Sequence, residues 1–131
     1  MSRCSKTAAI LLGICAAFPN AGLGSTSPGA GVGAREEIEY LLTYLGNSGC
    51  RFYRNGSWHD AERAKSHLGR KYEYYLKQTE TPSADEFIRE AASKSSVSGE
   101  AYMVSCQGHA PRPSSDWFNE ALSRLRASTG R

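Results

Sequence analysis

Apolar residues recur at the spacing of one helix face in four stretches of the chain, and this pattern predicts four helices. The first is expected to begin near Ala34, with acidic residues at its positive start, and to end in the glycine-rich segment 46–49. The second follows Asp60, which can cap it, and runs to about Gln78. The inward-facing residues predicted for these two helices are Ile38, Leu41, Leu42, Leu45, Ala61, Ala64, Leu68, Tyr72, Tyr75 and Leu76. The charges elsewhere on the second helix are interpreted as a solvated face: Arg63, Lys65, Arg70 and Lys71.

Two further helices are predicted after residue 82. Ser83 and Glu86 form a capping box for the third, because each side chain can satisfy a free backbone donor. Ser114 or Ser115 is expected to cap the fourth. The predicted buried residues of this pair of helices are Phe87, Ile88, Ala91, Ala92, Trp117, Phe118, Ala121, Leu122 and Leu125.

Strand signals lie between these helices. Asn55-Gly56 sits between aromatic flanks and predicts a type I′ hairpin turn that places Tyr53 opposite Trp58. Alternation over residues 102–106 predicts a later strand, and residues 107–113 are expected to form a loop. The predicted fold class is therefore α+β, with four helices packed around a small antiparallel sheet made of the hairpin plus one later strand.

The N-terminal segment, residues 1–24, has the pattern of a secretory signal peptide. A short basic start precedes an apolar run, residues 8–18, that is too short to span a bilayer, and small residues follow. The preferred cleavage site is after Gly24, with Ala21 and Gly22 as alternatives. Lipid attachment at Cys15 is a less favoured alternative, because the bulky Ile14 precedes it. We expect a periplasmic protein without a transmembrane segment in the mature chain.

The cysteines follow from this leader. Cleavage removes Cys4 and Cys15 and leaves Cys50 and Cys106 in an oxidising compartment, where an even count favours pairing. A redox-active thiol is the alternative, but the chain has no Cys-x-x-Cys motif. We therefore expect a structural disulfide between these two residues.

The domain organisation is simple. Residues 25–33 are rich in Ser, Gly and Pro and are expected to be a flexible linker, 34–127 a single α+β domain, and 128–131 a disordered tail. The formal charge is +3, of which the leader supplies two positive charges. A mature domain so close to neutral lacks the basic excess of a general nucleic-acid binder, so we expect no nucleic-acid partner.

Residues 96–102 form the most distinctive polar stretch. Its serines and Gly99 can simply satisfy a loop, or they can present hydroxyl donors to a protein or a cell-wall glycan. The candidate binding loop consists of Ser96, Ser98, Gly99 and Tyr102.

Local catalytic signatures such as His-Glu-x-x-His, Gly-x-Ser-x-Gly and the Walker loop are missing from the sequence, so no catalytic residue is assigned. Asp60 and His67 lie on one helix side, but two ligands do not make a zinc site, and we expect no metal and no cofactor. His67 is interpreted as a helix-surface or sheet-packing residue. A small envelope hydrolase that uses Ser98 and a histidine remains an alternative.

Several separated segments resemble one known family. They are residues 50–56 (CRFYRNG), the pairs His67-Leu68 and Lys71-Tyr72, and residues 92–104 (ASKSSVSGEAYMV). The chain from about residue 35 to 125 is similar to domain of unknown function 5329, a family of small exported proteins of Gram-negative bacteria. The resemblance implies export and a shared fold, with no assigned reaction.

The function expected from these features is that of an exported periplasmic binding module, without enzymatic activity, whose partner is an envelope protein or a cell-wall glycan. A second alternative comes from the pattern Ser-x-Ser-Gly-x-x-Tyr at residues 96–102. It resembles the loop that exported bacterial inhibitors of C-type lysozyme insert into the enzyme's cleft. Those inhibitors are β-barrels, so a shared role would be convergent.

Overall fold

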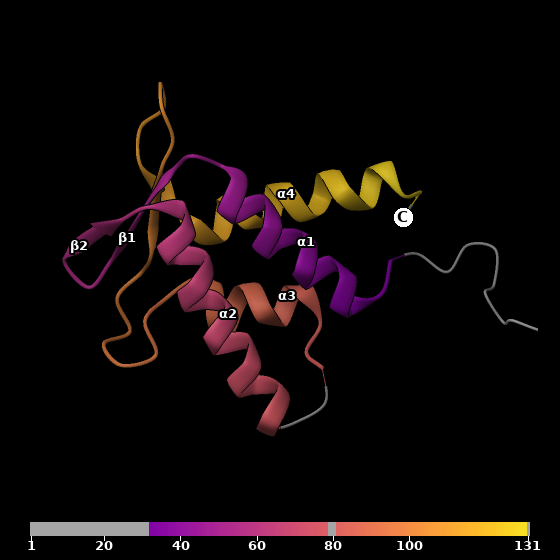
Figure 1. Ribbon diagram of the computed structural model, residues 1–131. Coiled ribbons are helices and arrows are strands. Elements are labelled where there is room, and N and C mark those ends of the chain that lie inside the picture. The colour runs from indigo at the N-terminus through magenta and orange to yellow at the C-terminus, as the bar shows by residue number, and fades with distance from the viewer. Residues whose placement is uncertain (1–31, 79–80, 131) are drawn as a thin grey trace, which may run out of the picture.

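A computed structural model describes residues 32–78 and 81–130. The predicted signal peptide, residues 1–24, lies outside these residues, as does the predicted linker apart from Val32 and Gly33. The elements appear in Figure 1 and are, in chain order, α1 (Ala34–Asn47), β1 (Arg51–Arg54), β2 (Ser57–His59), α2 (Ala61–Gln78), α3 (Ala84–Phe87), the π-helical turn η1 (Ile88–Ala92), β3 (Met103–Ser105), β4 (Arg112–Pro113) and α4 (Ser114–Ser128). No helix within the described ranges is long and apolar enough to span a bilayer.

The strands form one antiparallel sheet in the order β2-β1-β3-β4. Asn55 and Gly56 both adopt positive φ, 45° and 87°, as a type I′ turn requires. Tyr53 pairs with Trp58, with ring centroids 5.5 Å apart. The predicted hairpin and its register are therefore confirmed.

A disulfide joins the two central strands of the sheet, β1 and β3, at one end. Arg51 of β1 pairs with Ser105 of β3, so the cysteines that flank this pair become neighbours. Cys50 and Cys106 are bonded, with Cα atoms 4.3 Å apart. The predicted disulfide and the α+β fold class are confirmed.

The prediction of a plain loop over residues 107–113 is wrong at its end. Arg112 and Pro113 form β4, which pairs with Val104 and Met103 at the sheet edge. Two residues are too few to show alternation in the sequence, and a proline is tolerated on an edge strand because no ladder partner needs its missing N–H.

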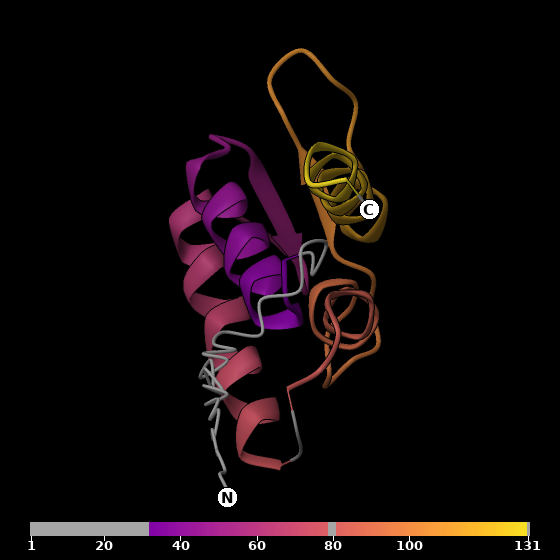
Figure 2. The same cartoon turned by 90° about the vertical axis from the view of Figure 1, so that its right-hand side faces the viewer.

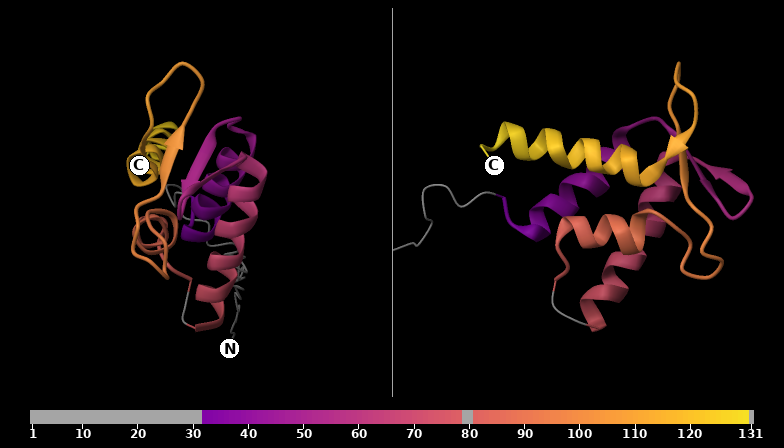
Figure 3. Two further views of the ribbon diagram at one scale, coloured as in Figure 1. Left: turned by 90° about the vertical axis from the view of Figure 1, so that its left-hand side faces the viewer. Right: turned by 180° about the vertical axis from the view of Figure 1, so that it is seen from behind.

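Helices enclose the core beside this sheet. Figures 2 and 3 show α1 and α2 side by side, with α3 and α4 on the other side of α1. The fully buried large side chains at the centre come from α1, α3, η1, β3 and α4: Ile38, Leu41, Leu45, Phe87, Ile88, Val104, Phe118 and Leu122. The sheet lies at one end of the molecule and the last turn of α4 at the other (Figure 1).

One inward-facing prediction in α2 is wrong. Leu76 is 36% exposed, whereas Tyr72 is buried and Tyr75 is half-buried. The Tyr72 ring contacts Phe87, and the Tyr75 hydroxyl lies 3.4 Å from the Glu90 carbonyl. The two tyrosines therefore cover α3 and η1 and leave Leu76 at the edge of the stripe.

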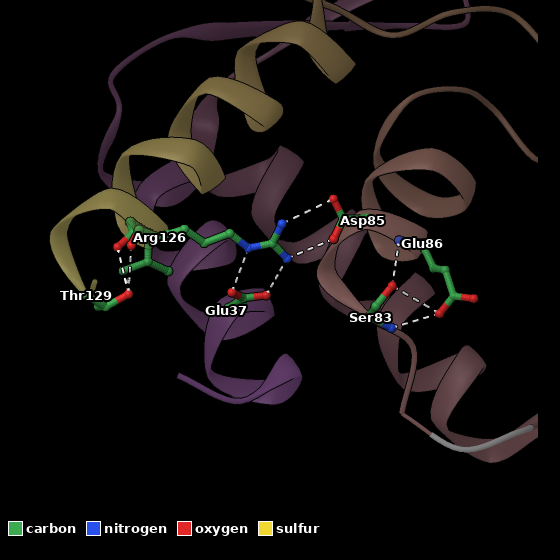
Figure 4. Close-up of polar contacts among 7 residues, drawn as sticks. Glu37, Ser83, Asp85, Glu86, Arg126 and Thr129 are labelled. Carbon is green, nitrogen blue, oxygen red and sulfur yellow. Dashed lines mark hydrogen bonds and ion pairs between the residues drawn. The ribbon is translucent and has the colours of Figure 1, made fainter. Parts of the chain in front are cut away.

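The helix starts are capped in different ways. The capping box of Ser83 and Glu86 is confirmed (Figure 4), and Asp60 Oδ1 accepts the Arg63 backbone N–H at 2.8 Å. The predicted serine cap of α4 is wrong, because Pro113 occupies the N-cap position and makes no side-chain cap bond. Ser114 is instead buried inside the first turn, and its hydroxyl donates to the Ala92 carbonyl at 2.6 Å.

Candidate functional site

Four polar side chains meet between the hairpin, α2 and the residue before β3. They form what we call the basic cluster: Arg54, His67, Lys71 and Tyr102. His67 and Lys71 are four residues apart on α2, a spacing that places both on one helix face. Arg54 ends β1, and Tyr102 directly precedes β3, the strand that pairs with β1. The sheet register therefore brings these groups together from distant parts of the sequence.

His67 lies between Arg54 and Tyr102. Arg54 Nη1 is 3.0 Å from Nδ1 and 3.5 Å from Nε2 of the imidazole, so the guanidinium lies against the face of the ring. His67 Nε2 is 3.1 Å from the Tyr102 hydroxyl oxygen. Burial, together with the charges of Arg54 and Lys71, lowers the pKa of His67 to about 4. The imidazole is therefore neutral at pH 7.

Lys71 contributes a positive charge beside the tyrosine. Its Nζ donates to the Lys94 carbonyl at 3.0 Å and lies 3.5 Å from the Tyr102 hydroxyl. The ammonium also lies over the Tyr102 ring, 5.2 Å from the centroid. Burial, and to a smaller extent the charge of Arg54, lowers the pKa of Lys71 to about 8. Burial also raises the pKa of Tyr102, so its hydroxyl keeps its proton at neutral pH.

The basic cluster has no acidic counterpart in the parts of the chain that the structure describes. No carboxylate there lies within 4.0 Å of a side-chain nitrogen of Arg54 or Lys71. The charges that act on His67 come from basic residues alone. Two half-buried cations thus share one site without a carboxylate between them.

A small cavity of about 30 Å³ adjoins the cluster. Phe52, Leu68 and Phe118 supply its apolar walls, and Arg54 and Tyr102 are among its polar lining groups. This volume suffices for one or two water molecules but not for an organic ligand. A larger ligand would therefore have to bind outside this cavity.

The predicted binding loop is fastened to the hairpin turn next to the cluster. Ser95 is buried, and its Oγ accepts from the backbone N–H groups of Val97 and Ser98 and from Asn55 Nδ2, each at 3.2 Å. Ser98 Oγ donates to Asn55 Oδ1 at 2.8 Å and accepts the Glu100 N–H at 3.2 Å. Val97 is 95% exposed at the tip of the loop. The loop therefore presents this tip from a braced backbone.

The candidate loop residues are separated in the structure. Ser96, Ser98 and Gly99 are exposed on the loop, and Gly99 adopts a positive φ of 75°. Tyr102 is buried, with its hydroxyl in the basic cluster. Binding through the loop stays a prediction. The hydroxyl of Ser98 is bonded to Asn55 and the Glu100 N–H rather than to a histidine, so these contacts lend no support to the hydrolase alternative.

Sequence reasoning missed the roles of two cluster members. The sequence pattern places Lys71 on a solvated face, which is wrong because Lys71 is half-buried, and it gives Arg54 no role. Nothing in the local sequence links either residue to Tyr102. The available signal was the His67/Lys71 spacing of four residues on a face next to Leu68. Within the described ranges, no group of three or more His, Cys, Asp or Glu side chains is placed to hold a metal ion.

A second polar cluster joins α1, α3 and α4 (Figure 4). Arg126 of α4 donates to both oxygens of Glu37 of α1, each at 2.9 Å, and to Asp85 of α3 at 2.8 Å. The Glu37 side chain is only 3% exposed. The hydrogen bond from Arg126 lowers the pKa of Asp85. All three groups satisfy one another, so we interpret this cluster as structural.

Comparison with known proteins identifies one family. A family model described as a family of unknown function, DUF5329, matches residues 32–126. No curated protein and no solved structure matches the chain.

Proposed function

The chain belongs to the family of unknown function DUF5329, and from that premise we propose that it is an exported binding protein of the bacterial cell envelope, without enzymatic activity. The observation that carries this proposal is the basic cluster, a site of fixed hydrogen-bond donors beside a braced loop. Such a site can hold a ligand with little loss of side-chain freedom.

The protonation state of His67 supports binding over catalysis. A general base works best when its pKa lies near the operating pH and one nitrogen can reach the substrate. His67 has a pKa of about 4, and its two nitrogens contact Arg54 and Tyr102. The histidine therefore organises the site and is poorly suited to take a proton from a substrate.

The disulfide supports export. Bonds such as Cys50–Cys106 persist in oxidising compartments and are rare in the bacterial cytosol. The leader pattern of residues 1–24 points in the same direction, so the proposed location is the periplasm.

Photocrosslinking in intact cells tests the proposal. A photoreactive residue replaces Val97 at the loop tip, and a matched control replaces exposed Ser128, the last residue of α4. We expect an adduct with an envelope component from position 97 alone, and we expect Lys71→Gln to reduce it. Equal adducts from both positions, or adducts with cytosolic proteins only, would contradict the proposal.

Lysozyme inhibition is the alternative function, and the exposed, braced tip at Val97 is the observation that favours it. Protection of cells in a lysozyme turbidity assay, lost on Ser96→Ala with Ser98→Ala, would establish it. Absence of protection at micromolar excess of the purified protein would remove it.

A further inference from the structure

We propose that the basic cluster binds a phosphate monoester group, with Lys71 and Arg54 as its hydrogen-bond donors. The inference deepens the proposed function, because it rests on the protein being a binding module and names the chemistry of the ligand.

The hydrogen bonds left open in the basic cluster are all donors. Lys71 has three N–H groups and uses one on the Lys94 carbonyl and one toward Tyr102. The Tyr102 oxygen accepts from Lys71 and lies 3.1 Å from His67 Nε2, so the tyrosine hydroxyl is engaged within the cluster. Arg54 engages only His67 through Nη1 among the described residues, which leaves most of its five N–H donors. A ligand that complements this set must be an acceptor with several oxygens.

Charge narrows the choice of ligand. His67 is neutral, so the cluster carries the two positive charges of Arg54 and Lys71. A phosphate monoester carries a charge of about −1.5 to −2 at pH 7 and offers three strong acceptor oxygens. A carboxylate offers two oxygens and a single charge, and would leave one cation and one donor group without a partner. The match in both number and charge favours the phosphate monoester.

The surroundings add to this preference. Arg63 and Arg70 from α2 and His59 from β2 lie around the cluster, and the charges of Arg54, Arg70 and Lys71 act on His67. The Glu100 carboxylate accepts from the Tyr53 hydroxyl at 3.2 Å and is not within ion-pair distance of Arg54 or Lys71. The positive charges of Arg54 and Lys71 repel each other, and this repulsion raises the free energy of the ligand-free protein. An anion bound to both residues would reduce the repulsion.

The cavity decides how the ligand sits. Its volume of about 30 Å³ cannot admit the rest of an organic phosphate. The phosphoryl group would therefore contact the cluster from outside the cavity, with its ester substituent directed toward solvent. This arrangement suits a phosphate carried by a larger molecule, either a free metabolite or a lipid headgroup.

Titration of the purified protein with glycerol phosphate, followed by calorimetry and thermal unfolding, tests the proposal. We expect saturable binding and a rise in Tm, because a ligand that binds only the folded state stabilises it. Lys71→Gln should weaken binding by about tenfold or more, as expected for loss of a hydrogen bond to a charged group. The matched control Lys77→Gln, which removes the same charge from an exposed position of α2, should bind like the wild type.

Two measurements exclude trivial explanations. Acetate at the same ionic strength should bind far more weakly, and equal binding of acetate would overturn the proposal. Without ligand, the Lys71→Gln protein should have the wild-type Tm or a higher one, because the substitution removes one of two cations that repel each other. Arg54→Gln is the second variant, and it should also weaken phosphate binding. Undiminished binding in both variants would overturn the proposal.

Vesicles distinguish the two sources of the phosphate. Cosedimentation with vesicles that contain phosphatidic acid, but not with pure phosphatidylcholine, assigns the ligand to a membrane lipid, whereas binding of glycerol phosphate alone assigns it to a soluble compound. Binding of neither overturns the inference. If the protein binds no phosphate but still forms the crosslinked adduct at position 97, the proposed function holds and the ligand is a different one. If the protein binds phosphate but forms no adduct with an envelope component, the phosphate site holds and the proposed role in the envelope is rejected.

Discussion

At the scale of single residues, His67 shows how position sets chemistry. On α2 it lies between the Arg54 guanidinium and the Tyr102 hydroxyl, and its neutral state follows from this half-buried place beside cations. Exposed histidines ordinarily titrate near pH 6.5. Here burial is the largest cause that lowers the pKa to about 4, and the adjacent cations add to it.

This shift makes stability depend on pH. The unfolded state binds a proton on His67 below about pH 6.5, whereas the folded state binds it only below about pH 4. Stability from this residue is therefore fully present above pH 6.5 and is lost as the pH falls toward 4. The Tm of the wild type should drop more steeply across this range than that of His67→Gln. Parallel pH profiles for the two proteins would contradict the assignment.

Ser114 gives a second prediction at this scale. Its buried hydroxyl bonds the Ala92 carbonyl at 2.6 Å and ties the start of α4 to the end of η1. Ser114→Ala should lower the free energy of unfolding by about 1–2 kcal/mol, because it leaves that carbonyl without its donor. Ser115→Ala is the neighbouring control and should cost about 0.5 kcal/mol or less. The reverse order in urea unfolding would indicate a serine cap at Ser115 after all.

At the scale of elements, the features that depend on residues close in sequence could be predicted, whereas those that depend on long-range contacts could not. The hairpin turn and the capping box follow from residues that are close in sequence, Asn55 with Gly56 and Ser83 with Glu86, so both were predictable. Strand β4 was not predictable, because it forms only by pairing with Val104 and its neighbour in β3. The basic cluster was not predictable for the same reason, because Tyr102 lies 31 residues from Lys71 in the sequence.

Arg126 tests how the helices are joined. Arg126→Met removes the guanidinium from the buried Glu37 carboxylate, 89 residues away, and from Asp85. We expect a loss of about 2–4 kcal/mol in the free energy of unfolding, because breaking a buried ion pair costs more than the pair contributes. Arg126→Met combined with Glu37→Gln should recover part of the loss. Arg124→Met removes an exposed arginine from the same helix and should have little effect.

At the scale of the whole molecule, the sheet, the braced loop and the basic cluster lie together at one end of the protein. Arg126 joins α4 to α1 and α3 in a separate cluster. The disulfide fixes the strand register that this site requires, since Cys50 and Cys106 flank the pair formed by Arg51 and Ser105. The proposed anion site and the proposed export are thus linked, because the bond that holds the strands in place forms in an oxidising compartment.

Replacing both cysteines tests this linkage. Cys50→Ala with Cys106→Ala should lower the free energy of unfolding by about 4 kcal/mol, the chain-entropy value for a loop of this length. It should also weaken glycerol phosphate binding, because β1, which ends in Arg54, and β3, which directly follows Tyr102, lose the covalent bond that joins them. Chemical denaturation of oxidised wild type, reduced wild type and the double variant measures the first effect. Equal stability of all three would contradict the role given to the bond.

The most direct test of the whole account is the state of these two sulfurs in protein isolated from the periplasm of intact cells. Thiol alkylation under native conditions, followed by mass spectrometry, should leave Cys50 and Cys106 unmodified and recover their peptides as one crosslinked pair. Reduction before alkylation should modify both. Protein found in the cytosol with both thiols free and alkylated would contradict the account.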